Sequence, residues 1–168
     1  MHLNSERLTI RELTLDDANF IVSLLNSEAF LVNIGDRNVH TKKHAEDKIK
    51  NQYTDNYPEY GLFAVELTDS AKLIGTVSYL KRDYLEQDDI GYAFLPEFWG
   101  KGYALESART VVDYKLKQGV QHIWGVVNAD NLASIKLLEK LNFKTTGLVV
   151  MEGDEEPILK MELMPNTL

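Results

Sequence analysis

Residues 98–106, FWGKGYALE, connect a strand-like stretch to a helix-forming stretch through two glycines, Gly100 and Gly102. The first N–H groups of a helix have no partner inside the helix, and the helix dipole attracts anions to that end. Glycine at this position lets the oxygens of an anion approach the backbone, because no Cβ stands in the way. The stretch therefore predicts a phosphate-binding loop. A tight turn without a ligand is the alternative that the glycines alone leave open.

Two well-known phosphate loops do not match this stretch. The P-loop pattern requires a glycine five residues before Gly100 and Ser or Thr after the lysine, where this chain has Leu95 and Gly102. The dinucleotide-binding pattern requires Gly or Ala at the position of Leu105. The sequence therefore argues against a nucleotide-binding protein.

The segments on either side of this loop alternate between strand and helix patterns. Strands are predicted over residues 6–13, 61–68, 72–80, 88–95 and 122–128, with two more around a turn within 146–163. Helices are predicted over residues 14–31, within 40–53 after a Thr41 cap, over 100–119 and over 131–142. The pattern indicates the α+β class, with a mixed sheet and helices on its faces.

Helical spacing predicts which side chains of the last two helices face the core. One apolar stripe contains Ala104, Ala108, Val111, Val112 and Leu116, and the other contains Leu132, Ile135, Leu138 and Leu141. Gly119 is expected to end the first of these helices.

The composition excludes several kinds of site. The chain has 168 residues, which fits one domain, and its lack of cysteine excludes disulfides, thiolate zinc sites and a cysteine nucleophile. His40 and His44 have the spacing of metal ligands on a helix, but no acidic third ligand follows, so no metal is expected. The first residues lack the apolar run of a signal peptide and no stretch has the length of a membrane span, which predicts a cytoplasmic protein without a membrane partner.

The net charge of −8 argues against a nucleic-acid partner, because neutralising phosphates requires a basic face. An acidic chain is compatible with a cationic acceptor such as an amine. Solubility is the simpler explanation of the same charge.

Residues 99–104, WGKGYA, resemble the acyl-CoA loop of the GNAT N-acetyltransferases, whose pattern is Gln/Arg-x-x-Gly-x-Gly/Ala. Gly102 and Ala104 match the last two fixed positions, whereas Trp99 replaces Gln or Arg. With this tryptophan the loop is similar to that of the branch of the ribosomal-protein N-acetyltransferases RimJ and RimL, in which an aromatic residue and Trp-Gly usually precede Lys-Gly-Tyr-Ala. Residues 6–13, 89–106 and 128–143 also resemble this branch, except that Asn142 stands where glycine is usual.

The resemblance implies one GNAT domain over residues 1–168, with three layers and a mixed, mostly antiparallel sheet flanked by about four helices. It implies acetyl-CoA as the co-substrate, with the pyrophosphate on the backbone of residues 99–104. The implied contact residues there are Trp99, Gly100, Lys101, Gly102, Tyr103 and Ala104. The amide of Ala93 or Phe94 would face the thioester oxygen, and a homodimer stays open.

The resemblance also implies that Asn131 binds the cofactor arm and that Ser134 donates a proton to the CoA sulfur. An ordinary first helical turn is the alternative for both. Asp89 is the predicted base, with Asp88 and Glu86 as alternatives.

The predicted reaction is direct attack of a primary amine on acetyl-CoA, with a protein N-terminal α-amine as the leading acceptor. An α-amine has a pKa of about 7.7–8 and needs little help from a base. A small amine (a polyamine, an amino-acid derivative or an aminoglycoside) and a non-catalytic acyl-CoA-binding module are the alternatives.

Overall fold

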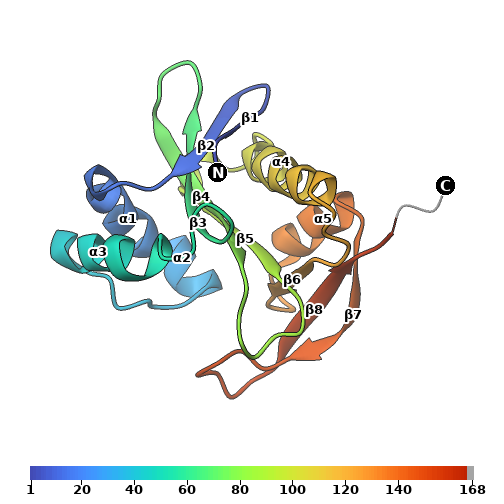
Figure 1. Cartoon of the computed structure of the whole chain (residues 1–168). Coiled ribbons are helices and arrows are strands. Elements are labelled where there is room, and N and C mark those ends of the chain that lie inside the picture. Colours follow the sequence, from blue (N-terminus) through green and yellow to red (C-terminus); the bar gives the residue numbers. More distant parts are fainter. Residues whose placement is uncertain (166–168) are drawn as a thin grey trace.

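The computed structural model describes residues 1–165, and a single mixed sheet runs through them (Figure 1). Its strands are β1 (Leu3–Asn4), β2 (Leu8–Glu12), β3 (Gly61–Leu67), β4 (Leu73–Leu80), β5 (Asp89–Phe94), β6 (Trp124–Val127), β7 (Phe143–Val149) and β8 (Ile158–Leu163). The order across the sheet is β1-β2-β3-β4-β5-β6-β8-β7. Neighbouring strands are antiparallel except β5 and β6, which are parallel.

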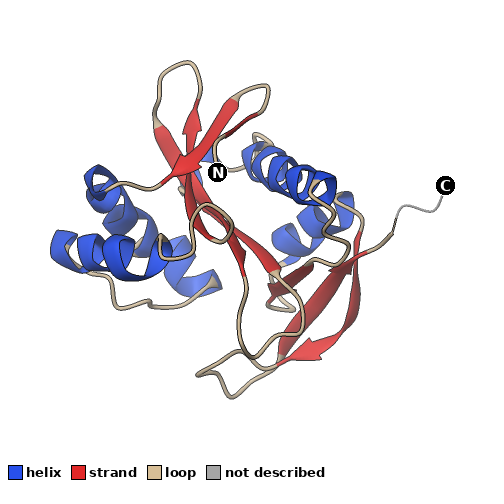
Figure 2. Cartoon of the chain, viewed as in Figure 1, coloured by secondary structure: helices blue, strands red, loops and turns tan. Residues whose placement is uncertain are grey.

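Helices cover both faces of this sheet (Figure 2). They are α1 (Ala18–Leu25), α2 (Glu28–Asn33), α3 (Lys42–Lys48), α4 (Tyr103–Lys117) and α5 (Leu132–Lys140). The first three lie on one side of the sheet and the last two on the other (Figure 1). The predicted three-layer α+β fold is confirmed, with five α-helices instead of about four in the described part of the chain. None of the helices within residues 1–165 combines the length and apolar character needed to cross a bilayer.

The additional helix arises because the predicted helix over residues 14–31 is two helices. α1 ends at Leu25, and the hydroxyl of Ser27 then accepts the N–H of Phe30 at 3.3 Å, which caps α2. Serine is a favoured N-cap because its oxygen satisfies a backbone donor that the helix cannot. A new helix therefore begins where the apolar spacing alone predicts one continuous helix.

Two apolar cores lie on opposite faces of the sheet. The core beneath α4 and α5 includes Phe63, Val77, Tyr79, Ile90, Phe94, Val111 and Phe143. The core beneath α1 and α3 includes Ile21, Leu24, Val39, Ala45 and Ala64. Successive side chains of a strand point to opposite faces, so β3, with Phe63 in one core and Ala64 in the other, contributes to both.

Two residues of the predicted helix stripes lie outside the core. Leu116 is 38% exposed and Leu132 is 64% exposed, so their inward placement was wrong. Lys115 is buried instead of Leu116, at 2% exposed. Its ammonium donates to the carbonyl of Glu59 at 2.7 Å and lies 4.4 Å from the ring centre of Tyr79. A long lysine stem can fill apolar space when its charged end finds such partners.

Strands β5 and β6 touch at one end only. Asp89 pairs with Trp124, and the N–H of Trp124 donates to the carbonyl of Asp88 at 2.8 Å. No later residues of β5 and β6 pair within the described structure. A gap therefore opens in the middle of the sheet, towards the C-terminal ends of both strands.

Candidate active site

The glycine loop lies between β5 and α4, at the open end of this gap. Gly100 has φ 73° and Gly102 has φ 81°, a left-handed conformation that glycine adopts without the penalty of other residues. A Cβ on Gly100 would meet no atom within 4 Å, so the space in front of this backbone is free. The loop is thus shaped for close approach of a ligand to the backbone.

Helix α4 presents its first N–H groups directly after this loop. Its first internal hydrogen bond runs from the N–H of Glu106 to the carbonyl of Gly102, at 3.0 Å. The N–H groups of Tyr103, Ala104 and Leu105 therefore have no carbonyl of this helix to donate to. Three donors at the positive end of the helix dipole can bind a phosphate group.

One edge of β5 borders the gap. The N–H of Leu95 donates to the carbonyl of Ile74 in β4, so this peptide group faces β4. The carbonyl of Asp88 accepts the N–H of Trp124 and therefore faces β6. Peptide groups alternate in direction along a strand, so those of Tyr92 and Phe94 face the gap. The family resemblance implies an amide near Ala93 or Phe94 for the thioester oxygen, and of these two amides that of Phe94 faces the gap.

Trp99 closes the loop against that same edge. Its indole N–H donates to the carbonyl of Phe94 at 2.9 Å, although the side chain is 51% exposed. The bond holds the start of the loop to the end of β5. The neighbouring Lys101 is exposed, with its ammonium 5.7 Å from the ring centre of Phe98.

Ser134 lies in the first turn of α5 and is held near β5. The side-chain oxygen of Asn131 caps α5 by accepting the N–H of Ser134 at 3.2 Å. The hydroxyl of Tyr92 donates to the carbonyl of Ser134 at 3.3 Å, and burial raises the pKa of Tyr92 to about 12. The hydroxyl of Ser134 itself has no bonding partner among residues 1–165. Tyr92 was not among the predicted site residues, and its alternation with Ile90 and Phe94 along β5 was the available signal.

Asp89 lies at the opposite end of β5 from Phe94, about 17 Å away at roughly 3.4 Å per residue. Its side chain is 2% exposed and accepts from Arg82 at 2.8 Å. Burial raises the pKa of Asp89, and the charge of Arg82 opposes that shift. The structure therefore does not bring Asp89 next to the loop, and the spacing of the sequence did not indicate Arg82.

Asp88, the alternative base, is engaged on the other face of the sheet. Its carboxylate accepts the hydroxyls of Tyr60 at 3.2 Å and Tyr79 at 3.1 Å. The two tyrosine rings stack with their centres 5.7 Å apart. Asp88, which is half-buried, is thus occupied by two tyrosines that pack in the core beneath α4.

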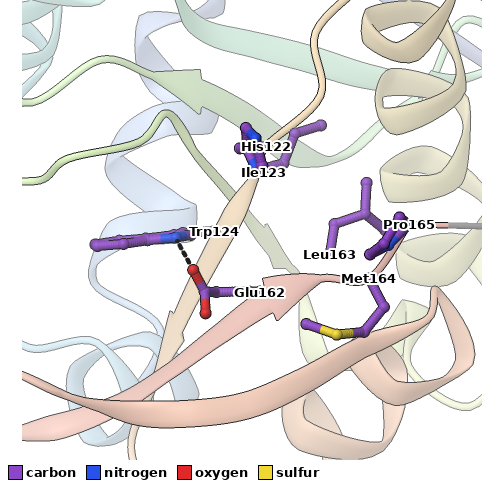
Figure 3. Close-up of a pocket in the computed structure, with 7 residues that line it drawn as sticks. All are labelled: His122, Ile123, Trp124, Glu162, Leu163, Met164 and Pro165. Atoms are coloured by element: carbon purple, nitrogen blue, oxygen red, sulfur yellow. Dashed lines mark hydrogen bonds between the residues drawn. The ribbon is translucent and has the colours of Figure 1, made fainter.

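A cavity of about 190 Å³ lies beside the first residue of β6 (Figure 3). It is lined by His122, Ile123, Trp124, Glu162, Leu163, Met164 and Pro165. The indole N–H of Trp124 donates to Glu162 at 2.8 Å inside it. The cavity touches β6 where β6 meets β5, whereas the gap opens beyond that point. It contains none of the site residues that the sequence predicts.

The family model described as "Acetyltransferase (GNAT) domain" matches residues 7–144. This chain belongs to the GNAT acetyltransferases. The uncharacterized N-acetyltransferase YoaA of Bacillus subtilis is 30% identical over 151 residues, which cover 88% of this chain and 85% of that protein.

Two solved structures have the same fold as this GNAT acetyltransferase. Spermidine N-acetyltransferase of Vibrio cholerae, in complex with CoA and spermine, has a TM-score of 0.77 at 23% identity and covers 94% of this chain and 95% of its own. The ribosomal-protein-S5-alanine acetyltransferase of Vibrio fischeri has a TM-score of 0.75 at 21% identity and covers 98% and 100%. The two structures therefore show the same architecture in enzymes with different acceptors.

Membership in this family makes the chain an enzyme with acetyl-CoA as its co-substrate. The glycine loop, the free N–H groups of α4 and the open edge of β5 fit a ligand that has phosphates at one end and amide groups along its arm.

Proposed function

We propose that this GNAT acetyltransferase, as one domain over residues 1–168, acetylates a protein N-terminal α-amine in the manner of the RimJ and RimL branch. One observation carries the cofactor part of the proposal. The left-handed Gly100 leaves free space in front of the loop at the start of α4, beside the unpaired edge of β5.

The pyrophosphate of acetyl-CoA lies on the loop in this proposal. The residues that bind it are Trp99, Gly100, Lys101, Gly102, Tyr103 and Ala104. The pantetheine arm follows the gap-facing edge of β5 and forms hydrogen bonds as an additional strand would. Asn131 at the start of α5 contacts the arm from the opposite side of the gap.

The chemistry is direct transfer from sulfur to nitrogen. The amine nitrogen attacks the thioester carbonyl carbon, a C–N bond forms, and the C–S bond then breaks. The amide of Phe94 donates to the oxygen that gains charge in the tetrahedral intermediate. Ser134, whose hydroxyl has no other partner among residues 1–165, donates a proton to the departing sulfur.

Asp89 is the proposed base for the attacking amine. Burial raises its pKa, which is the direction that suits a general base near neutral pH. Its distance along β5 from Phe94 requires that the proton travel through water. An α-amine, with its pKa of about 7.7–8, makes only a small demand on this base.

A small amine is the second candidate acceptor. The solved structures with this fold include one enzyme named for a ribosomal protein and one named for spermidine. The turn between β7 and β8 has Glu152, Asp154, Glu155 and Glu156, which suits a cation but equally suits a solvated turn. The homodimer and the cytoplasmic location stay predictions.

The test measures thiol release from acetyl-CoA with a panel of N-terminal peptides, polyamines, amino acids and aminoglycosides. The chain has no cysteine, so it adds no thiol background. The expected result is turnover with peptides that carry a free α-amine and none with their N-acetylated forms. Turnover with polyamines alone would overturn the protein acceptor. The Gly102→Leu variant is the negative control, because its side chain would occupy the loop.

A further inference from the structure

Arg7 connects the start of β2 to the start of α4, across 99 residues of sequence. Its Nε donates to Glu106 at 2.7 Å, and its Nη2 lies 2.6 Å from the same carboxylate oxygen. The backbone N–H of Arg7 and the hydroxyl of Ser5 donate to the other oxygen of Glu106, at 2.8 and 2.7 Å. Both oxygens of Glu106 are therefore held by the segment before β2.

The same guanidinium also contacts the glycine loop. Its Nη1 donates to the carbonyl of Lys101 at 2.9 Å, and its carbon lies 4.4 Å from the ring centre of Tyr103. A Cβ on Gly102 would stand 3.4 Å from Nη2. One side chain thus touches residues 101 and 103 and passes close to residue 102, all part of the segment that is proposed to hold the pyrophosphate.

Glu106 poses an electrostatic problem at this position. It lies in the first turn of α4, where its negative charge would repel a phosphate bound to the same helix end. Burial acts to raise the pKa of Glu106, but hydrogen bonds from Ser5 and Arg7 outweigh it and lower the pKa. The carboxylate is therefore charged at neutral pH, and Arg7 is the cation that compensates it.

We propose that Arg7 is a positioning residue for the acetyl-CoA loop. Its planar fork fixes the carbonyl of Lys101 and neutralises Glu106, so that the N–H groups of the loop and of α4 face the pyrophosphate in a positive environment. This inference rests on the proposed function, because it assumes that the loop binds acetyl-CoA.

The test is titration calorimetry of the full chain with acetyl-CoA. We expect Arg7→Ala to weaken binding roughly 10- to 100-fold, because it frees the loop and leaves the charge of Glu106 uncompensated. We expect Arg7→Ala combined with Glu106→Gln to bind more tightly than Arg7→Ala alone, since the second change removes the repelling charge. A structural role for Arg7 alone would not give this recovery.

A matched pair of lysine variants separates loop positioning from stability. Arg11, within β2, forms a similar fork, with bonds of 2.9 and 3.0 Å to Asp17, but it does not touch the loop. Arg7→Lys and Arg11→Lys both keep the charge and lose the fork geometry. We expect only Arg7→Lys to weaken acetyl-CoA binding, while thermal unfolding reports the stability of both.

Three outcomes would overturn the inference. Wild-type affinity in Arg7→Ala would show that the loop does not need this contact, and the proposed function would stand. Equal affinities of Arg7→Ala and the double variant for acetyl-CoA would show that Arg7 does not act by neutralising Glu106. If the wild-type protein failed to bind acetyl-CoA, the cofactor site and the inference would both fail.

Discussion

The hydroxyl of Ser134 is the smallest group on which the proposed chemistry depends. Its backbone N–H and carbonyl are bonded to Asn131 and Tyr92, and an alanine would keep both bonds. We therefore expect Ser134→Ala to fold with unchanged thermal stability and to lose about 10²-fold in kcat, the effect of removing a general acid. Thiol-release kinetics at saturating acetyl-CoA and thermal unfolding measure the two effects.

The control for this variant is Ser134→Thr, which keeps a hydroxyl at the same position. It should retain much more activity than Ser134→Ala. Equal kcat in the wild type and Ser134→Ala would show that Ser134 has no catalytic role and is an ordinary residue in the first turn of a capped helix.

Single residues also show where sequence patterns stop being informative. Asn131 and Ser134 were proposed as site residues because the segment that contains them resembles one of the RimJ and RimL branch, whereas their spacing alone predicts only an N-cap and the first turn of a helix. The ion pair between Asp89 and Arg82 was not found, because nothing in a strand pattern says which charge an acidic residue will meet. Asn142 has φ 68°, as expected for a residue that ends a helix in place of glycine.

At the scale of elements, helix α4 has a left-handed glycine before its first turn and another after its last. Gly100 and Gly119, with φ of 73° and 92°, both face open space. Gly100→Ala and Gly119→Ala should therefore cost similar stability, about 1–2 kcal/mol each. Only Gly100→Ala should weaken acetyl-CoA binding, by roughly tenfold or more, because its methyl group enters the space in front of the loop.

Chemical denaturation and titration calorimetry measure the two quantities in these variants. Equal affinities of Gly100→Ala and Gly119→Ala for acetyl-CoA would show that this glycine only shapes a turn.

Helix patterns predicted that α4 exists but not which residue completes its buried face. Leu116 and Lys115 are neighbours, and a rotation of the helix by part of one turn decides which of them is covered. The partners that make the burial of Lys115 tolerable, Glu59 and Tyr79, come from other segments. Periodicity within one segment contains no information about them.

For the whole molecule, the gap between β5 and β6 predicts that neighbouring amides of β5 differ in their rates of hydrogen exchange. The N–H groups of Gly91 and Ala93 face β4, and those of Tyr92 and Phe94 face the gap. We expect the first pair to be protected from hydrogen exchange without ligand. The second pair should exchange faster and become protected when acetyl-CoA binds, because the cofactor arm then accepts their hydrogen bonds.

Residue-resolved hydrogen exchange with and without acetyl-CoA measures this difference. Uniform protection along β5 in the free protein would show that the gap is already closed by other groups.

The sheet order is the part of the fold that local patterns could not provide. All eight strands except the two-residue β1 were predicted with their approximate bounds. The contact of β5 with β6 at one residue pair, and the contact of Arg7 with Glu106 across 99 positions, depend on how distant segments pack. The family resemblance predicted the mixed, mostly antiparallel sheet with helices on its faces. The contacts between distant segments became known only from the structure.

Because Lys115 is buried, chemical labelling of its amine can measure how often the protein unfolds. Acetic anhydride modifies accessible amines without an enzyme, and it would label an exposed lysine such as Lys101 in the folded protein. Lys115, at 2% exposed and bonded to a carbonyl, is out of reach until α4 separates from the sheet. The extent of labelling at this one amine therefore counts the molecules that have unfolded, in a protein whose own substrate is an activated acetyl group.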